Sequence, residues 1–347
     1  MIHSTAGSEP AAHSPSRRLH RIGLRCIVVP LDGSPLSERA LPVAIALASA
    51  TGAELRAVHV YVPLPRETAV HGLVDYAASV EALLEHDAGV YARDARRRFA
   101  TAAPGGGALH VDLARARPLT SLFGEASRTV AALGRYATRH AASLFVMTSH
   151  GRGGFSRAWI GSVADSFIRG TGVPVLLVRP DEARVLTSDF RNIIVAVDGS
   201  ALAEGVIPIA MSMAGAHGAR LTLVRVITIR AAVARPTPIA HVDTHDLDAQ
   251  REEAERYLAD LKDRIAAENL VIETKVVDEP VTMLSDVGPT RALLSYADAS
   301  GADLIALSTH GRSGFRRWML GSVADKVVRG APIATLVVRG DPREARG

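Results

Sequence analysis

Two stretches of this chain carry the same glycine-rich pattern, and loops of this kind are typical of sites that hold an anion. Residues 148–178 read TSHGRGGFSRAWIGSVADSFIRGTGVPVLLV, and residues 308–338 repeat the pattern as STHGRSGFRRWMLGSVADKVVRGAPIATLVV. Each stretch reads as the end of an apolar strand, a glycine-rich loop, a helix and another apolar strand. In that order, exposed backbone N–H groups and the positive end of the helix dipole favour a phosphate. The sequence therefore predicts two phosphate sites.

The glycine and serine residues of these stretches supply the groups that such a site needs. A glycine in the middle of each loop permits a positive φ or a close approach of the backbone to a phosphate, although it would also suit any tight turn. A Gly-Ser pair opens each following helix, and its hydroxyl can bind a phosphate or cap the helix within a Ser-x-x-Asp pattern. Both interpretations stay open for Gly151, Gly161, Ser162, Gly311, Gly321 and Ser322.

Arginines and histidines recur in the same loops. The arginines could neutralise the charge of a phosphate, although exposed arginines are common in loops of any kind. The histidines have no carboxylate at the spacing of a metal site, which favours a hydrogen-bonded role within the loop. These residues are His150, Arg152 and Arg157 in the first copy and His310, Arg312 and Arg317 in the second.

An Asp-Gly-Ser tripeptide follows the first apolar strand of each half, at Asp32 and at Asp198. A carboxylate beside a triphosphate would repel it, so its role in a nucleotide site is to accept hydrogen bonds from a ribose or an adenine. The alternative is an Asx turn that precedes a helix capped by the serine. Both roles stay open.

Apolar strands alternate with helices through both halves, which predicts the α/β fold class. Five strands in each half, joined by right-handed crossovers, form a doubly wound parallel sheet. The expected strands of the first half are 26–31, 55–62, 109–113, 144–147 and 175–178. Those of the second half are 193–197, 221–227, 271–277, 304–307 and 336–338.

The pattern of each strand predicts its place in the sheet. The third strand alternates polar and apolar residues and belongs at an edge, whereas the first and fourth are unbroken apolar runs and belong at the centre. The order 3-2-1-4-5 satisfies both conditions. It puts the topological switch point, where sheets of this kind bind ligands, between strands 1 and 4. The Asp-Gly-Ser turn and the glycine loop should therefore meet there.

The fifth strand forms the other edge, and in both halves it is apolar, without internal charge or proline. Such an edge invites another strand. We therefore expect the two fifth strands to pair, which makes the chain an internal pseudo-dimer of two domains, residues 22–180 and 190–340. Residues 1–21 lack the apolar segment of a secretory signal and are expected to form a disordered tail of a cytoplasmic protein.

Composition excludes several classes of protein. Hydrophobic residues make up 48% and charged residues 22% of the 347, as in globular proteins, and no apolar run reaches the roughly 18 residues of a membrane span. The net charge is +4 with basic and acidic residues interspersed, which argues against a nucleic-acid partner. The single cysteine, Cys26, lies in an apolar strand and is expected in the core. No motif supplies a general base for fast hydrolysis.

These motifs resemble those of a tandem universal stress protein over most of both halves. Nucleotide-binding members of that family carry a Gly-x2-Gly-x9-Gly-[Ser/Thr] loop after the fourth strand and an aspartate after the first. Gly151 and Gly161 have the required nine residues between them, as do Gly311 and Gly321. The first glycine of the family pattern is replaced in each half, by Thr148 and by Ser308.

The resemblance implies an adenine nucleotide, above all ATP with or without Mg, at the switch points. It places the nucleoside end at Asp32 and Asp198, and it matches Val60 and Val226 to positions whose backbone meets adenine. The implied function is that of a stress-response sensor or regulator, not an enzyme, which acts on an unknown regulatory protein and could itself pair as a homodimer. The alternatives are a ligand-free interaction module, which the replaced first glycines favour, and a slow ATPase.

Overall fold

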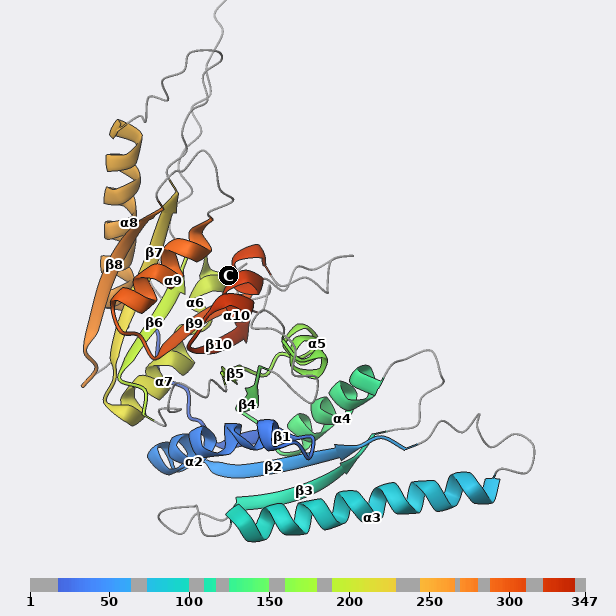
Figure 1. Cartoon of the computed structure of the whole chain (residues 1–347). Helices are drawn as coiled ribbons and strands as arrows, with labels where there is room; N and C mark the ends of the chain where they lie inside the picture. The colour runs from blue at the N-terminus through green and yellow to red at the C-terminus, as the bar shows by residue number, and fades with distance from the viewer. Residues whose placement is uncertain are drawn as a thin grey trace, which may run out of the picture.

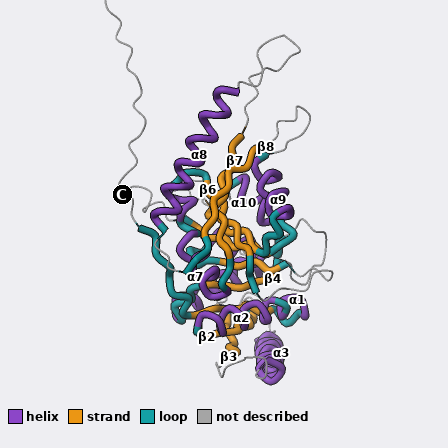
Figure 2. Tube along the Cα trace, turned by 90° about the vertical axis from the view of Figure 1, so that its left-hand side faces the viewer, coloured by secondary structure: helices purple, strands orange, loops and turns teal. Residues whose placement is uncertain are grey.

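The structure is a computed structural model of the chain. It describes residues 18–63, 74–99, 109–116, 125–149, 160–179, 189–228, 244–265, 269–279, 288–309 and 321–340. In this part of the chain, ten strands form one sheet with helices on both faces (Figure 1). Figure 2 shows the strands as the middle layer of the molecule.

The two halves contain the same series of elements. The strands of the first half are β1 (Cys26–Leu31), β2 (Glu54–Tyr61), β3 (Leu109–Arg115), β4 (Leu144–Thr148) and β5 (Val175–Val178). Its helices are α1 (Pro35–Glu38), α2 (Ala40–Thr51), α3 (Val74–Phe99), α4 (Glu125–Arg139) and α5 (Ser162–Gly170). The strands of the second half are β6 (Asn192–Val197), β7 (Arg220–Thr228), β8 (Ile272–Glu279), β9 (Leu304–Thr309) and β10 (Ala334–Arg339). Its helices are α6 (Ala201–Glu204), α7 (Ile207–His217), α8 (Thr244–Arg264), α9 (Pro289–Ala299) and α10 (Ser322–Gly330).

The order of the strands confirms the predicted fold. The sheet runs β3-β2-β1-β4-β5-β10-β9-β6-β7-β8, so each half has the order 3-2-1-4-5. Neighbouring strands within a half are parallel, whereas β5 and β10 pair antiparallel, with Leu176 opposite Leu336. The predicted pairing of the fifth strands is therefore present, and because of it the two five-stranded sheets are one continuous sheet.

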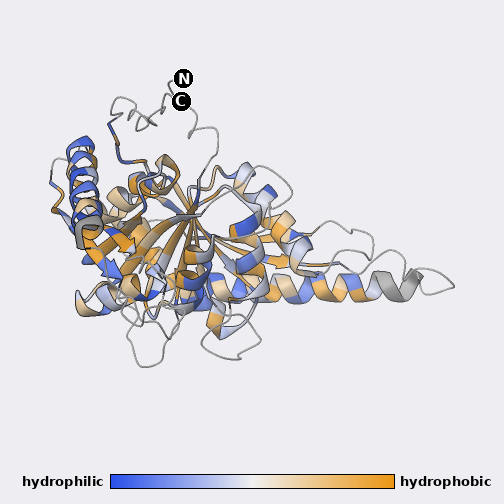
Figure 3. Cartoon of the chain, turned by 90° about the horizontal axis from the view of Figure 1, so that it is seen from above, coloured by the Kyte–Doolittle hydropathy of each residue, from blue (hydrophilic) through white to orange (hydrophobic). Residues whose placement is uncertain are grey.

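Each face of the sheet has its own hydrophobic core, and each core extends across both halves. One core packs the sheet against α2 and α7, with Leu41 and Met211 fully buried. The other packs it against α4, α5, α9 and α10, with Phe167 and Val327 fully buried. In Figure 3 the strands between these helices are the most hydrophobic part of the molecule. A central strand such as β1 is apolar throughout because both of its faces are covered.

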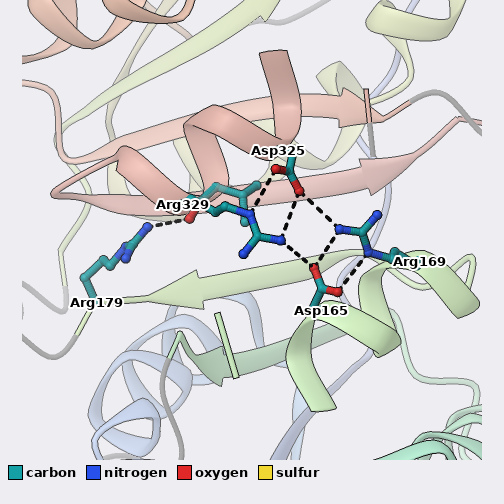
Figure 4. A network of polar contacts seen from close by, with 6 residues as sticks. Asp165, Arg169, Arg179, Asp325 and Arg329 are labelled. Carbon is teal, nitrogen blue, oxygen red and sulfur yellow. Dashed lines mark hydrogen bonds and ion pairs between the residues drawn. The ribbon is translucent and has the colours of Figure 1, made fainter. Parts of the chain in front are cut away.

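Four charged side chains join the halves where β5 and β10 meet (Figure 4). Arg169 of α5 binds Asp165 of its own helix at 2.9 Å and reaches Asp325 of α10 at 3.1 Å. Arg329 of α10 binds Asp325 at 2.9 Å and reaches Asp165 at 3.4 Å. The exposed fractions of these side chains lie between 17% and 33%. The network is therefore a partly buried and reciprocal contact about the internal twofold axis.

The beginning of the described chain lies against the second half. Leu19 forms a parallel bridge with Ile265, and its N–H donates to the carbonyl oxygen of Arg264 at 2.9 Å. Three residues on, the carbonyl oxygen of Ile22 accepts from the hydroxyl of Ser212 at 2.6 Å. The expectation of a disordered tail through residue 21 did not include this contact: residues 18–21 belong to the described part, and Leu19 has a backbone partner at the end of α8. Residues 1–17 lie outside the described part.

The thiol of Cys26 lies in the core, as expected, with 3% of the residue exposed. Burial raises the pKa of this thiol, and the nearby Glu54 carboxylate raises it further. Because the folded-state pKa lies above the unfolded one, the neutral thiol stabilises the fold below the unfolded pKa of about 8.5. That contribution is lost as the pH rises further.

We therefore expect Cys26 to escape alkylation in the folded protein. At mildly alkaline pH, iodoacetamide should leave the native chain unlabelled over a time that labels the urea-unfolded chain completely, which mass spectrometry would measure. Labelling of the native chain at the rate of the unfolded one would contradict the burial of this strand.

No helix in the described part of the chain is both long enough and apolar enough to cross a membrane.

Candidate functional site

The strand register brings the predicted site segments of the first half to one edge of the sheet. β1 pairs with β4, with Val28 opposite Phe145, and extension of this register places Leu31 level with Thr148. β1 also pairs with β2, with Leu31 opposite His59, so that Asp32 follows level with Val60. The carboxyl ends of three adjacent strands thus bring Asp32, Val60 and Thr148 together at the predicted switch point.

The second half repeats this arrangement. β6 pairs with β9, with Ala196 opposite Leu307, so that Ser308 follows level with Val197. β6 also pairs with β7, with Val197 opposite Arg225, which places Asp198 level with Val226. Each half therefore has an aspartate, a valine and a hydroxyl residue at the same edge.

The Asp-Gly-Ser tripeptides form Asx turns that lead into capped helices. The N–H and the hydroxyl of Ser34 donate to Asp32 Oδ1 at 2.9 and 2.5 Å, and Ser34 Oγ in turn accepts the N–H of Ser37 at 3.2 Å. Gly33 has φ of 81°, a conformation that glycine adopts without strain. The alternative structural role of Asp32 is therefore present in the structure.

The turn of the second half has the same geometry. The N–H and the hydroxyl of Ser200 donate to Asp198 Oδ1 at 2.9 and 2.6 Å, and Ser200 Oγ accepts the N–H of Ala203 at 3.1 Å. Both bonds to the carboxylate use a single oxygen, and Asp198 is exposed. Within the described residues, no donor hydrogen-bonds to Oδ2 of Asp198. This oxygen is therefore able to accept a hydrogen bond from a ligand.

Replacing Asp198 by alanine should remove both bonds and destabilise the protein by about 1 kcal/mol, the usual net value of a hydrogen bond to a partly exposed group. Asp32→Ala should have at least this effect, because its carboxylate accepts the same two bonds from Ser34. Urea denaturation would measure the changes. Asp263→Ala, on the exposed side of α8, is the control and should lie within about 0.5 kcal/mol of the wild type. Equal effects at all three positions would contradict the turn's role.

The N-cap of each helix that follows a glycine loop is a glycine and not the serine. Gly161 is the N-cap of α5, with φ −56° and ψ 143°, and Ser162 is the exposed first residue of the helix. Asp165 does not return to the cap, because its carboxylate binds Arg169. The capping box proposed for Ser-x-x-Asp is therefore absent here.

The second half shows the same helix start at Gly321 and Ser322, with Asp325 bound to Arg329. Among the described residues, neither N-cap glycine provides a side-chain cap, and the first N–H groups of an α-helix have no acceptor within the helix. Both helix starts therefore keep the donors and the positive dipole end that an anion needs.

The base of the first glycine loop is closed by one backbone hydrogen bond. The N–H of Gly161 donates to the carbonyl oxygen of Ser149 at 2.6 Å, so the chain leaves β4 and enters α5 at the same point. The loops themselves, residues 150–159 and 310–320, lie outside the described part of the chain. The roles predicted for their residues stay predictions: His150, Gly151, Arg152, Arg157, His310, Gly311, Arg312 and Arg317.

Ser308 stands where the family pattern has its first glycine. Its hydroxyl oxygen is buried and finds no hydrogen-bond partner among the described residues. A buried hydroxyl without a partner is costly, by roughly 1–3 kcal/mol. This oxygen faces the turn between α6 and α7, since a Cβ on Gly205 would lie 3.6 Å from it. The serine at this position is therefore able to hydrogen-bond a group that enters the site.

A glutamate, a tyrosine and an arginine hold each Asp-Gly-Ser turn to a long helix, a feature that the sequence analysis missed. Glu38 accepts from Tyr91 at 2.9 Å and from Arg98 at 2.6 and 2.7 Å. Burial and the glutamate raise the pKa of Tyr91, so the phenol stays protonated and donates. The same set recurs as Glu204, Tyr257 and Arg264, at the same spacings of 53 and 60 residues. That repeated spacing was the signal available in the sequence.

The two sites differ beside these tyrosines. His59 lies 5.0 Å from the ring of Tyr91, whereas Arg225 at the corresponding position lies 5.2 Å over the ring of Tyr257. The Arg225 guanidinium also contacts the Asp-Gly-Ser turn, since a Cβ on Gly199 would lie 3.6 Å from it. The second site therefore has a permanent positive charge where the first has an imidazole.

Within the described residues, no group of three or more His, Cys, Asp or Glu side chains is placed to hold a metal ion.

Comparison with known proteins identifies the family. The model of the universal stress protein family matches residues 23–179 and 189–339. A universal stress protein of Mycobacterium tuberculosis is 27% identical over 327 residues, which cover 90% of this chain and 94% of that protein. Another one from the same organism is 28% identical over 199 residues, 57% of this chain and 62% of that protein.

The fold also has a counterpart among solved structures. The crystal structure of a universal stress protein from Archaeoglobus fulgidus superimposes with a TM-score of 0.61 at 17% identity, over 92% of this chain and 99% of that one. This likeness extends over both halves. Together with the two matches of the family model, it shows that the chain belongs to the universal stress protein family and carries two of its domains in tandem.

Proposed function

We propose that each half binds ATP or a related adenine nucleotide at the switch point. The observation that carries this proposal is the helix start after each glycine loop, whose first N–H groups have no side-chain cap from the N-cap residue within the described part of the chain. Such a helix start beside an Asx turn, at the carboxyl ends of strands 1 and 4, is repeated in both halves. A phosphate would lie at Ser162 or Ser322, because the helix dipole favours it there.

The other residues have roles that suit the rest of a nucleotide. The carboxylates of Asp32 and Asp198 would accept hydrogen bonds from the ribose hydroxyls, and the backbone of Val60 and Val226 would meet the adenine. The arginines predicted in the loops would neutralise phosphate charge, and Mg would accompany a triphosphate as its counter-ion. The buried hydroxyl of Ser308 would gain the partner that the described residues do not give it.

The biological role that we infer is that of a cytoplasmic sensor or regulator in a stress response. The nucleotide would bind one state of the glycine loop more tightly than the other and so order the loop. This ordering would change a surface that a regulatory protein recognises. We infer no fast enzymatic reaction, since the chain carries no motif that supplies a general base beside the phosphates. A steady release of phosphate from ATP would contradict this point.

The nucleotide content of the freshly purified protein tests the proposal. The protein would be denatured, and the supernatant separated by anion exchange with ultraviolet detection. We expect an adenine nucleotide in the wild type and none in a variant with Ser162→Glu and Ser322→Glu. A glutamate suits the first turn of a helix, so the fold should persist while the new charges repel phosphate.

Thr138→Glu, on the exposed side of α4, is the matched control and should retain the nucleotide. If the wild type carries no nucleotide and binds none at low millimolar concentrations, the ligand-free interaction module replaces this proposal.

A further inference from the structure

The Asp-Gly-Ser turn of the second half has an arginine packed against it. A Cβ on Gly199 would lie 3.6 Å from Cζ and Nη2 of Arg225 and 3.7 Å from its Nη1. Because these three distances are nearly equal, the plane of the guanidinium faces the turn. A guanidinium donates within its own plane, so its N–H groups run alongside the turn and not into it. They can therefore reach an acceptor that lies beside the turn.

Two further contacts hold Arg225 without using all of its donors. The guanidinium lies over the ring of Tyr257, 5.2 Å from the ring centroid, and Nη2 donates to Glu253 Oε1 at 3.1 Å. Among the described residues, Nη1 has no hydrogen-bond acceptor. The Glu253 side chain is 62% exposed, and an ion pair with so exposed a carboxylate is weak. A phosphate at the turn can therefore replace this glutamate as the partner of the arginine.

The first half has a histidine at this position, and its neutral ring presents the opposite polarity. His59 Nδ1 lies 3.0 Å from the carbonyl oxygen of Leu31. A carbonyl oxygen only accepts, so Nδ1 carries the proton of the neutral ring and Nε2 has a lone pair. A lone pair repels a phosphate oxygen. The first turn thus has a neutral acceptor where the second has a permanent cation.

The second turn is also the more open of the two. Asp198 and Gly199 are exposed, whereas Asp32 and Gly33 are half-buried. In the nucleotide site proposed above, both aspartates accept hydrogen bonds from the ribose. A phosphate on a ribose hydroxyl would then lie beside the turn, where the aspartate repels it and Arg225 attracts it. Dinucleotide sites use a nearby arginine in the same way when the ribose of the ligand carries a 2′-phosphate.

We propose that the second site prefers an adenine nucleotide with a phosphate on the ribose to one with a free ribose, whereas the first site has no such preference. This inference rests on the proposed nucleotide site and adds the class of its ligand. One ribose hydroxyl donates to Asp198, and the neighbouring oxygen bears the phosphate. Arg225 exchanges Glu253 for this phosphate and is the residue that distinguishes the second site from the first.

Calorimetric titration of each site tests the preference. The probes are AMP and two adenosine bisphosphates, which differ from AMP only in a phosphate on the 2′ or the 3′ oxygen. In a Ser162→Glu chain, which keeps the second site, at least one bisphosphate should bind about tenfold or more tightly than AMP, the effect of one charge-assisted hydrogen bond. In a Ser322→Glu chain, which keeps the first site, neither should.

Exchange of the two side chains tests the cause. With the second site alone, Arg225→His should abolish the preference, and Glu253→Gln should increase it several-fold because the competing carboxylate is gone. With the first site alone, His59→Arg should create the preference. Arg256→His, on the exposed side of α8, is the control and should leave the preference of the second site unchanged.

Titration with ATP separates this inference from the proposed function. If the second site binds ATP but binds neither bisphosphate more tightly than AMP, the preference is wrong and the nucleotide site stands. The same holds if both sites show an equal preference, or if Arg225→His weakens ATP and the bisphosphates alike, which would make the arginine a structural residue of the turn. If neither site binds any of these nucleotides, both proposals are wrong.

Discussion

Truncating Phe167 to alanine should destabilise the protein by about 3–5 kcal/mol. The side chain is fully buried and its ring lies 4.4 Å from the ring of Phe145, a distance at which aromatic pairs attract each other beyond their burial. Loss of the ring leaves a cavity beneath α5, and the helix start at Ser162 depends on how α5 sits on the sheet. We therefore expect a weaker fold and, at permissive temperature, weaker nucleotide binding in the first half.

Urea denaturation of the Phe167→Ala chain would measure this loss. Val327→Ala is the matched control, because Val327 occupies the same position of α10 and is also fully buried. It should cost about half as much, since valine has fewer carbons to lose. If the phenylalanine were no more sensitive than the valine, the aromatic pair would not hold α5 as described.

The contact between the two halves predicts a large and non-additive effect at Leu176 and Leu336. The two residues are opposite each other in the β5–β10 register, and both are fully buried in the same core. Each alanine substitution should cost about 2–5 kcal/mol. Because they share one cavity, the double variant should differ from the sum of the singles by roughly 0.5–3 kcal/mol.

A double-mutant cycle from denaturation curves gives this coupling. The control cycle combines Leu176→Ala with Leu221→Ala on β7, four strands away and about 19 Å distant. Those two changes should add within about 0.5 kcal/mol. Strict additivity of Leu176 and Leu336 would mean that the fifth strands do not meet in solution.

The fold was predictable because the sequence carries its pattern twice. A central strand such as β1 is marked by an unbroken apolar run, and the edge strand β3 by alternation. The edge formed by β5 had no charge or proline to protect it, and its pairing with β10 satisfies the backbone groups of both strands. Each of these patterns lies within a single strand and reports how much of that strand is buried. The place of each strand in the sheet can therefore be predicted from one sequence.

Other features depend on contacts between distant segments. The bond from Leu19 to Arg264 joins residues that nothing in their local sequence connects. Likewise, whether Ser162 caps its helix depends on where the chain enters the helix, and a hydrogen bond to Ser149 makes Gly161 the cap instead. Asp165, the expected capping partner, is held by arginines of both halves. Tertiary contacts thus decide details that a short motif leaves open.

The site was predicted in part. The positions of Asp32, Val60 and Thr148 follow from strand order alone, because parallel strands end at the same edge. The difference between His59 and Arg225 was not anticipated, since its meaning depends on the tyrosine that each residue contacts.

The number of ATP molecules bound per chain tests the central proposal most directly. Equilibrium dialysis with labelled ATP and Mg should give two for the wild type, one for Ser162→Glu, one for Ser322→Glu and none for the double variant. These values would establish two independent sites at the two helix starts. Binding that persists in the double variant would place the nucleotide elsewhere, and no binding to the wild type would contradict a nucleotide-binding function.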